Sequence, residues 1–401
     1  MKFERYTVQE LIDMDMLEEP LDGNHGSLHP KASDYVSSGI PFIMANNLVD
    51  GDVDLINCAF ITEEQARTLR KGFSKSGDVL LTHKATIGRT AIVPEKYETV
   101  ILTPQVTYYR VKKGIDNRFL KYYFDSPDFQ ATLNNWAGAG STRAYLGIIA
   151  QHKLLILLPQ IEEQRKIADV LWALDEKIKM NKMINKNLEE QAQAIFYHYF
   201  INCKEIPCSW QEGSLLDIAD FLNGLAMQKF RPQDDKSSLP VLKIKELRQG
   251  ACDADSDRCS TEIKHEYIIH DGDVIFSWSG SLLVDFWCGG QCGLNQHLFK
   301  VTSAKYDQWL YYSWTKYHLR EFVAMAADKA TTMGHIKRDA LEKARVLIPS
   351  HEDYVRIGDL LQPIYDAIIA NRVANRELAN LRDTLLPRLM SGEIDVSSIE
   401  L

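Results

Sequence analysis

Apolar positions recur at helical spacing in two long stretches of the chain. In the segment from Glu162 to Phe200, apolar residues and asparagines alternate at intervals of four and three, at Ile167, Leu171, Leu174, Ile178, Asn181, Asn185 and Leu188. This spacing places all of these side chains on one face of an α-helix, as in the seam of a coiled coil. A helix of about 39 residues would be roughly 58 Å long.

A second stretch repeats the first. At an offset of 190 residues, the same positions hold an apolar residue or the same asparagine, at Ile357, Leu361, Ile364, Ile368, Asn371, Asn375 and Leu378. One heptad pattern is common in helical sequences, but two copies at one offset indicate a duplication. Because a helix with such a seam is not stable alone, the two segments are predicted to pack on each other as an antiparallel pair.

The duplication extends into the segments that precede the helices. Three pairs of short motifs return in the same order while their offset drifts from 199 to 195 to 190 residues: Ile40–Phe42 with Leu239–Val241, Ser76–Thr82 with Asp271–Ser277, and Gly140–Arg143 with Ala330–Met333. Such drift is expected of repeated units whose loops have changed length. Each unit is therefore predicted to consist of a globular part followed by a long helix.

The globular parts are predicted to mix strands and helices. Short runs rich in β-branched and aromatic residues predict strands at 79–82, 91–93, 105–111 and 274–277, and helical patterns occur at 117–136 and 306–327. The predicted fold class is α+β, with two pseudo-repeated mixed α/β domains separated by a pair of long antiparallel coiled-coil helices. The expected boundaries are 1–160 and 203–350 for the domains, 161–202 and 351–392 for the helices, and 393–401 for a tail.

The helix pair is expected to act as a spacer. Antiparallel helices would place the two domains at opposite ends, around a pseudo-twofold axis, and such an arrangement suits a DNA target with two half-sites. The seam asparagines, Asn181, Asn185, Asn371 and Asn375, leave two interpretations open. If buried, they would trade stability for register; at the edge of the seam, they would face water.

Composition and charge narrow the class of protein. With 401 residues, 45% of them hydrophobic and 25% charged, the chain is predicted to be a soluble protein of two or three domains. No apolar run approaches the ~20 residues of a membrane-spanning helix, and the N-terminus lacks a secretory pattern, so a cytoplasmic protein is expected. The excess of 55 Asp and Glu over 46 Lys and Arg argues against coating DNA through bulk positive charge, although residues 61–121 are locally basic.

The seven cysteines are an odd number and do not suggest a disulfide framework. Four of them fall close together in the second half, with histidines nearby: Cys252, Cys259, Cys288 and Cys292. Their spacing does not match the paired motifs of structural zinc sites. Ordinary semi-buried thiols are therefore favoured over a metal site, and no metal is expected.

Two motifs resemble those of a known family. The run LPQIEEQRKIA, from Leu158 to Ala168, continues into the first heptad segment and resembles the central helical region of type I restriction-modification specificity subunits. The closing run LRDTLLPRLMSGEI, from Leu381 to Ile394, is similar to the C-terminal end of that family. The start of the second helix, PSHEDYV from Pro349, departs from the pattern because it lacks the Glu-Gln pair of the first.

The resemblance implies a non-catalytic subunit with two target-recognition domains. Such a subunit would recognise an asymmetric, two-part DNA site. It would join two methyltransferase subunits and, in the full enzyme, motor-nuclease subunits. It would hold no cofactor itself, and S-adenosylmethionine, ATP and Mg are expected in the partner subunits.

Candidate DNA contacts are cations, hydroxyls and amides in two equivalent pairs of loops. In the first domain they are Thr82, Lys84, Thr86, Arg89, Gln105, Ser141, Thr142, Arg143 and Tyr145, with His83 in the same loop. In the second domain they are Trp278, Ser279, Ser281, Gln296, Lys329, Thr331, Thr332 and Lys337, with His335 among them. Gln105 and Gln296 are predicted to occupy matching sites. The alternative at each position is a polar turn without a ligand.

Two other functions compete with DNA recognition. Catalysis is disfavoured, because the sequence lacks the Asn/Asp-Pro-Pro-aromatic motif of adenine methyltransferases, a phosphate-binding G-x-x-x-x-G-K-[ST] motif and a compact nuclease cluster. The segment Asp22–Gly26 with His29 invites a metal or nuclease interpretation, but glycine-rich polar loops of this kind are common, so catalysis stays disfavoured. The second alternative is a coiled-coil scaffold that recruits protein partners without binding DNA.

Overall fold

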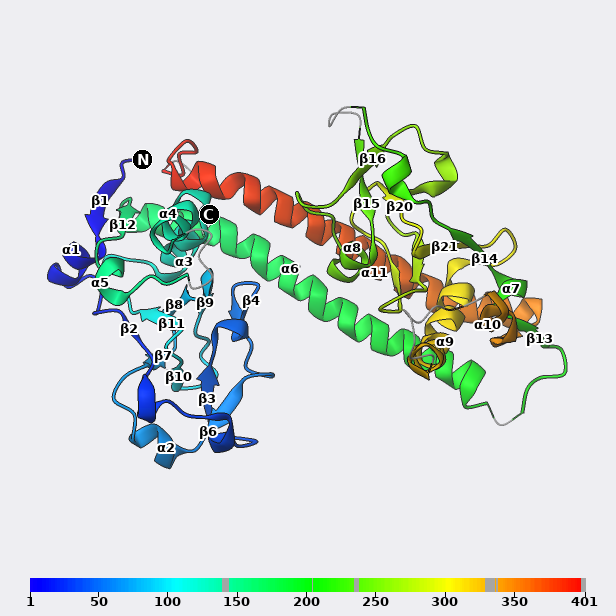
Figure 1. The fold of residues 1–401 in the computed structure, drawn as a ribbon, viewed down its shortest axis with the longest axis horizontal. Helices are drawn as coiled ribbons and strands as arrows, with labels where there is room; N and C mark the ends of the chain where they lie inside the picture. The colour runs from blue at the N-terminus through cyan, green and yellow to red at the C-terminus, as the bar shows by residue number, and fades with distance from the viewer. Residues whose placement is uncertain (139–143, 204, 234–237, 329–335, 337, 398–401) are drawn as a thin grey trace. The chain divides into compact units, whose positions relative to one another are not determined.

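The computed structural model describes residues 1–401 except 139–143, 204, 234–237, 329–335, 337 and 398–401 (Figure 1). The chain divides into two compact units, one of Met1–Glu176 with Asn380–Leu401 and one of Lys177–Ala379. Each unit contains one mixed globular domain and one part of each of two long helices, α6 (Ile161–Phe196) and α11 (His351–Met390). The boundary between the compact units falls inside both helices, so it does not test the boundaries expected between domains and helices. Those boundaries stay predictions.

The first domain is built on two four-stranded sheets. Its strands are β1 (Glu4–Thr7), β2 (Leu21–Asp22), β3 (Ile40–Ile43), β4 (Leu48–Val49), β5 (Asp52–Val53), β6 (Ala59–Ile61), β7 (Phe73–Lys75), β8 (Val79–Lys84), β9 (Thr86–Ile92), β10 (Thr99–Leu102), β11 (Val106–Tyr109) and β12 (Leu155–Leu158). Its helices are α1 (Val8–Asp13), α2 (Glu63–Arg67), α3 (Asn117–Asp125), α4 (Pro127–Trp136) and α5 (Ile148–Gln151), with 3-10 turns at Gly26–Leu28, Ala32–Asp34 and Ala45–Asn47. The sheet orders are β6-β3-β10-β7 and β2-β11-β8-β9, and β1-β12 and β4-β5 form separate pairs.

The second domain has the same plan. Its strands are β13 (Gln211–Ser214), β14 (Asp220–Asn223), β15 (Ser238–Leu242), β16 (Arg258–Ser260), β17 (Ile268–Ile269), β18 (Val274–Ser277), β19 (Leu283–Phe286), β20 (Cys292–Leu294), β21 (Leu298–Thr302) and β22 (Arg345–Ile348). Its helices are α7 (Leu215–Ile218), α8 (Ile244–Gln249), α9 (Gln308–Asp328) and α10 (Arg338–Lys343), with 3-10 turns at Met227–Lys229 and His265–Tyr267. The sheet orders are β16-β15-β20-β17 and β14-β21-β18-β19, with β13-β22 as a separate pair.

The sequence repeat is a structural repeat at the level of strand register. In the first domain β8 pairs antiparallel with β11, so that Thr82 lies opposite Val106; in the second, β18 pairs with β21 and Ser277 lies opposite Leu298. A parallel strand pairing at the equivalent place is also shared, β3 with β10 and β15 with β20. The fold is therefore the predicted one, two related mixed α/β domains with a long helix between them along the chain.

One predicted helix is divided in two. The pattern at 117–136 suggests a continuous helix, but α3 ends at Asp125 and α4 begins at Pro127. Proline has no N–H to donate and forces the residue before it towards an extended backbone, which Ser126 adopts at φ −62° and ψ 142°. The prediction of one helix was wrong because Pro127 is well placed at the start of a helix and poorly placed inside one.

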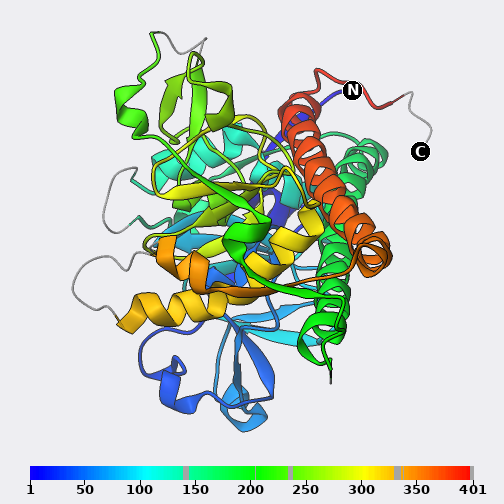
Figure 2. The same ribbon diagram turned by 90° about the vertical axis from the view of Figure 1, so that its right-hand side faces the viewer.

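Within each unit the two long helices pack antiparallel, and the stretches of α6 and α11 that belong to one unit lie side by side in both ribbon views (Figures 1 and 2). In the first unit the start of α6 and the end of α11 share one hydrophobic core, which contains Ile167, Leu171 and Leu389. In the second unit the end of α6 and the start of α11 share another, which contains Phe196 and Leu361. A π-helical turn at Tyr197–Ile201 follows α6. Among the described residues, no helix is long and apolar enough to cross a membrane.

The predicted seam positions differ in how deeply they are buried. Ile167, Leu171, Ile357, Leu361 and Ile368 are fully buried. Leu174, Ile178, Leu188, Ile364 and Leu378 are partly buried. The fully buried group packs against domain residues as well as against the other helix. Each domain is thereby attached to the helices through its own hydrophobic core.

The four seam asparagines form a hydrogen-bonded group inside the second unit. Asn181 Nδ2 donates to Asn375 Oδ1 at 2.8 Å, and Asn371 Nδ2 donates to Asn185 Oδ1 at 2.8 Å. Asn185 also donates to the Ile368 carbonyl at 3.1 Å, and Asn375 donates to the corresponding carbonyl of the other helix at 3.4 Å. Asn181 and Asn185 are only 2% and 6% exposed, so the interpretation that they face water is wrong. Each of these bonds has a counterpart in which both residues are exchanged for those 190 positions away, as expected if the two helices are related by a local twofold axis.

Candidate nucleic-acid interface

In the first domain, backbone hydrogen bonds hold the β8–β9 turn against the segment that precedes α5. Ala85 N donates to the Ala144 carbonyl at 3.0 Å, and Leu146 N donates to the His83 carbonyl at 2.9 Å. The His83 side chain adds a third bond, from Nδ1 to the Leu146 carbonyl at 2.9 Å. Ala85 has a left-handed backbone with φ of 66°, which makes the turn tight. Two loops distant in sequence therefore form one surface.

The candidate residues of this surface differ in accessibility. Lys84, Arg89 and Tyr145 are exposed, and Lys84 Nζ lies 6.0 Å from the centre of the Tyr145 ring. Thr86 and Gln105 are partly buried. Thr82 is fully buried, and its hydroxyl accepts from Arg89 N at 2.9 Å. Thr82 therefore stabilises the hairpin, while the exposed side chains are free to meet a ligand.

The second domain joins the equivalent loops in the same way. Ile336 N donates to the Trp278 carbonyl at 3.0 Å, the counterpart of the bond from Leu146. Ser281 is exposed and Trp278 and Gln296 are partly buried. Ser279 is buried, and its hydroxyl lies 3.0 Å from His297 Nδ1. The serine therefore belongs to the interior of the loop rather than to its surface.

Several candidates fall outside the described residues. They are Ser141, Thr142 and Arg143 in the first domain and Lys329, Thr331, Thr332, Lys337 and His335 in the second. Their proposed contacts with DNA stay predictions from the sequence.

The predicted match between Gln105 and Gln296 is wrong by one residue. His83 N donates to the Gln105 carbonyl at 3.0 Å, and Trp278 N donates to the His297 carbonyl at 3.4 Å. His297 is therefore the structural counterpart of Gln105. The loops before β11 and β21 have changed length, so that the offset from one domain to the other differs between neighbouring strands.

Sequence reasoning noted the loop from Asp22 to His29 but dismissed it as a common type, and so missed the polar cluster that Asp22 forms beside the first loop pair. Asp22, at the end of β2, is almost fully buried; His25 Nε2 lies 2.9 Å from its Oδ2 and Lys71 pairs with its Oδ1. His83 Nε2 lies 3.9 Å from the same carboxylate and has no hydrogen-bond partner. Burial lowers the pKa of His83, although Asp22 opposes the shift, so the ring is neutral at neutral pH. A lone Asp in a polar loop gives no sequence signal for this arrangement.

The comparisons with known proteins identify the repeated domain. A family model described as the type I restriction modification DNA specificity domain matches residues 20–190 and again residues 207–378. The chain belongs to this family. It thus contains two specificity domains in tandem.

Named relatives and a solved structure agree with this membership. The specificity subunit of the type I restriction enzyme MjaIX from Methanocaldococcus jannaschii is 26% identical over 402 residues, which cover 92% of this chain and 90% of the relative. The HindI specificity subunit from Haemophilus influenzae is 20% identical over 317 residues, or 60% of this chain and 69% of the relative. The crystal structure of the type I restriction-modification S subunit from M. genitalium covers 97% of this chain and 96% of its own, with a TM-score of 0.59 at 13% identity. At that identity the likeness shows a shared fold.

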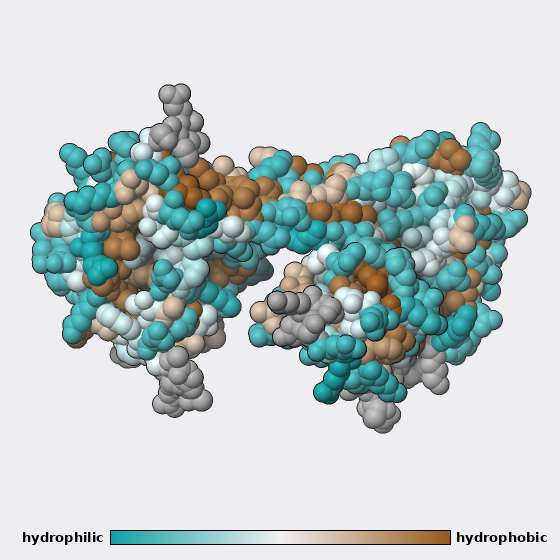
Figure 3. Space-filling view, turned by 90° about the horizontal axis from the view of Figure 1, so that it is seen from above, coloured by the Kyte–Doolittle hydropathy of each residue, from teal (hydrophilic) through white to brown (hydrophobic). Residues whose placement is uncertain are grey.

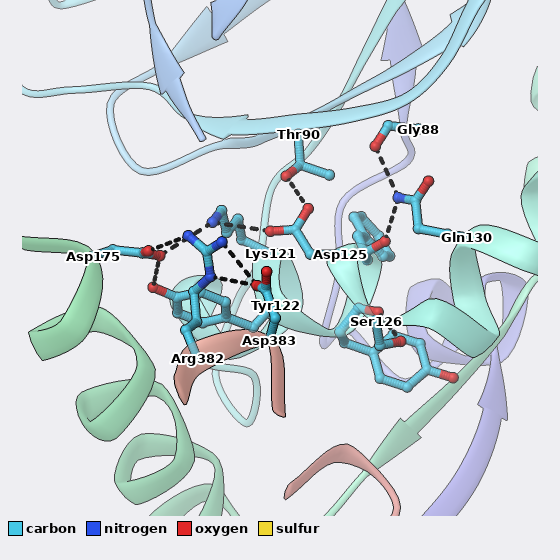
Figure 4. A network of polar contacts seen from close by, with 12 residues as sticks. Gly88, Thr90, Lys121, Tyr122, Asp125, Ser126, Gln130, Asp175, Arg382 and Asp383 are labelled. Atoms are coloured by element: carbon cyan, nitrogen blue, oxygen red, sulfur yellow. Dashed lines mark hydrogen bonds and ion pairs between the residues drawn. The ribbon is translucent and has the colours of Figure 1, made fainter. Parts of the chain in front are cut away.

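A polar network attaches the first specificity domain to both helices of its unit (Figure 4). Arg382 of α11 donates to Asp175 of α6 at 2.7 Å. Lys121 of α3 lies 2.9 Å from Asp125 and 3.8 Å from Asp175. Asp125 also accepts from Thr90 on β9. The strand that leaves the candidate hairpin is thereby connected to the helix pair.

Tyr122 contributes a further bond to this network. Its hydroxyl donates to Asp175 at 2.6 Å, and burial together with that carboxylate raises the pKa of the phenol. In the second specificity domain an arginine makes the equivalent connection, since Arg372 of α11 lies 2.8 Å from Glu189 on α6 and 2.8 Å from Asp285 on β19. Each domain is therefore fixed to the helices by charge as well as by apolar contacts.

The clustered cysteines are all free thiols in the structure. Cys259, Cys288 and Cys292 are buried and Cys252 is partly buried. Within the described ranges no group of three or more His, Cys, Asp or Glu side chains is arranged to hold a metal ion.

Proposed function

We propose that this chain is the DNA sequence-recognition subunit of a type I restriction-modification complex and that it recognises a bipartite site, one half-site per specificity domain. The observation that supports the proposal most strongly is the repetition of one loop pair on two equivalent sheets, with the same bonds from Leu146 and Ile336. Two related surfaces in one chain suit two separate segments of duplex. The subunit itself is non-catalytic in this proposal and needs no cofactor.

Recognition requires that the exposed cations and hydroxyls contact phosphates and base edges. Binding of the purified chain to random duplex should weaken with salt. The logarithm of the binding constant should fall with the logarithm of the salt concentration, with a slope near −0.9 for each phosphate neutralised. Selection of bound duplexes from a random pool should then return two conserved blocks separated by a fixed gap. A chain that binds no duplex at low salt would instead be the scaffold of the alternative hypothesis.

The proposal includes recruitment of methyltransferase subunits, and through them of motor-nuclease subunits. An apolar stripe on α6 supports this part: Met180, Met183 and Ile184 lie on one helical face and are 42–67% exposed. Hydrophobic surface is also visible on the face of the long helices shown in Figure 3. Exposed apolar side chains at helical spacing are typical of sites where partner helices pack.

Substitution on the stripe tests this recruitment. Met183→Glu should reduce the yield of complex with a co-expressed methyltransferase subunit severalfold and leave duplex binding by the chain itself unchanged. Gln193→Glu is the control, because it adds the same charge at an exposed position on another face of α6. Equal complex yields for the two variants would contradict docking at the stripe.

A further inference from the structure

The two specificity domains share one backbone framework, so that side chains at equivalent positions can be compared directly. Asp22 lies opposite Thr107 across β2 and β11, and Asn223 lies opposite Phe299 across β14 and β21. These registers agree with the pairing of β8 and β18 to the same central strands. Asp22 and Asn223 therefore occupy the same position, at the end of an outer strand beside the loop pair.

The backbone after this position is the same in both domains. Gly23 and Gly224 follow, and each lies against the end of the parallel strand. A Cβ on Gly23 would lie 1.8 Å from the Leu102 carbonyl oxygen, and one on Gly224 would lie 2.2 Å from that of Asn295. Only glycine fits at either place. The glycine is therefore required in both domains, whereas the side chain of the residue before it can differ.

An aromatic or imidazole ring faces this position in each domain. In the second domain Trp278 Nε1 donates to Asn223 Oδ1 at 3.0 Å. In the first, the equivalent His83 lies 3.9 Å from Asp22. The two rings belong to residues at equivalent backbone positions, since the backbone N–H of one donates to the Gln105 carbonyl and that of the other to the His297 carbonyl. The geometry is shared and the chemistry differs.

The polar group presented to solvent also differs. Asn223 is exposed, and the bond from Trp278 fixes its amide. Asp22 is buried, and the group it fixes is the half-exposed imidazole of His25, whose Nε2 lies 2.9 Å from the carboxylate. In each domain an otherwise rotatable polar group is therefore held in one orientation by a neighbouring side chain. Such fixed groups give more geometric selectivity than free ones, because less freedom is lost when they bind.

We propose that Asn223, oriented by Trp278, recognises a base in the second half-site and that His25, oriented by Asp22, is its counterpart in the first. This inference rests on the proposed function. With one lone pair of Oδ1 occupied by Trp278, Asn223 retains the second lone pair and both Nδ2 hydrogens. That set matches adenine, whose N7 accepts and whose N6 donates in the major groove.

The counterpart in the first domain presents a different pattern. When Nε2 of His25 donates to Asp22, Nδ1 is left as an acceptor. An acceptor recognises an exocyclic amino group of adenine or cytosine. The two domains are thereby expected to prefer different bases at equivalent places, as an asymmetric target requires.

The test uses the full chain and duplexes selected from a random pool. Asn223→Asp keeps the size of the side chain but replaces its donors with acceptors. It should lower the preference for adenine at one position of one half-site by roughly tenfold. The other half-site and the gap should remain unchanged. Asn202→Asp is the matched control, since it makes the same change at an exposed position of the same unit.

Two further variants keep the test decisive. Trp278→Phe retains a ring without the Nε1 donor and should weaken the same preference, while His25→Ala should relax a position in the other half-site only. Far-ultraviolet circular dichroism establishes that each variant is folded. A folded Asn223→Asp variant that selects the same bases as the parent, or one that loses both half-sites equally, would overturn the inference. A parent chain that selects no sequence at all would overturn the proposed function instead.

Discussion

At the scale of residues, spacing along the chain determines which side chains share a face, but not what they bond to. The heptad pattern placed Asn181 and Asn185 on the seam and left burial undecided. Their partners on the other helix, Asn375 and Asn371, settle the question by satisfying the buried amides. No sequence pattern could predict the contact of His83 with Asp22, because 61 residues separate them and neither belongs to a periodic segment.

The asparagine group predicts an asymmetry between single and double substitutions. Asn185→Leu leaves the partly buried Asn371 amide without its acceptor, which should cost about 1 kcal/mol, the low end of the range for an unsatisfied buried group. The double variant Asn185→Leu with Asn371→Leu removes both partners and should recover much of the loss. Urea unfolding followed by circular dichroism measures both, with Asn187→Leu on the exposed face as control. A single variant as stable as the parent would contradict the assignment.

The buried His83 predicts a pH dependence of the first specificity domain. Its folded-state pKa lies below the ordinary 6.5, because burial disfavours the charged ring. Below about pH 6.5 the unfolded chain therefore binds a proton that the folded domain does not, so stability is complete above that pH and falls as pH decreases. His83→Gln should lose less stability than the parent between about pH 7.5 and about pH 5.5. Identical losses by urea unfolding would exclude this role.

At the scale of elements, the long helices and most strands were predictable because their patterns are strong and their ends are marked. Pro159 and the acidic residues Glu162 and Glu163 mark the start of α6, where negative charge favours the helix dipole. The break between α3 and α4 follows from Pro127, which the apolar spacing alone conceals. The predicted match of Gln105 with Gln296 was wrong by one residue because loop lengths differ between the domains. Only the strand register reveals this difference.

The attachment of the first domain to the helices predicts a specific sensitivity at Arg382. Arg382→Met leaves the partly buried Asp175 with one charged partner fewer, and should lower the free energy of unfolding by about 1–3 kcal/mol. Arg165→Met is the matched control, because its pair with Glu162 is largely exposed, and such pairs contribute only about 0–1 kcal/mol. Equal effects on urea unfolding would mean that the network does not stabilise the junction.

At the scale of the whole molecule, the duplication is the feature that the sequence reveals best and that determines the rest. The fold class and the equivalence of the candidate loop pairs follow from recognising that one unit occurs twice, whereas the family resemblance rests on the motifs that begin at Leu158 and Leu381. In the recognition proposed above, the target bases do not follow from the duplication, because they depend on His25, held by Asp22, and on Asn223, and these side chains differ between the copies. Sequence and DNA shape act together in such recognition.

If the helices set the distance between half-sites, lengthening both should widen the gap. Insertion of one heptad after Glu176 and one after Ala379, where the chain passes from one compact unit to the other within each helix, adds about 10.5 Å to each helix. At 3.4 Å per base pair this corresponds to about three base pairs. Selection from a random pool would measure the new gap, and an unchanged gap in a variant that still binds would contradict the spacer role.

The independence of the two specificity domains is tested most directly by impairing only one of them. Lys84→Ala combined with Arg89→Ala removes two exposed cations from the first domain and leaves the second intact. Duplexes selected by this variant should keep one conserved block and the gap, while the other block becomes degenerate. If both blocks lose their sequence together, or if the parent selects a single continuous block, the two domains do not each recognise a half-site.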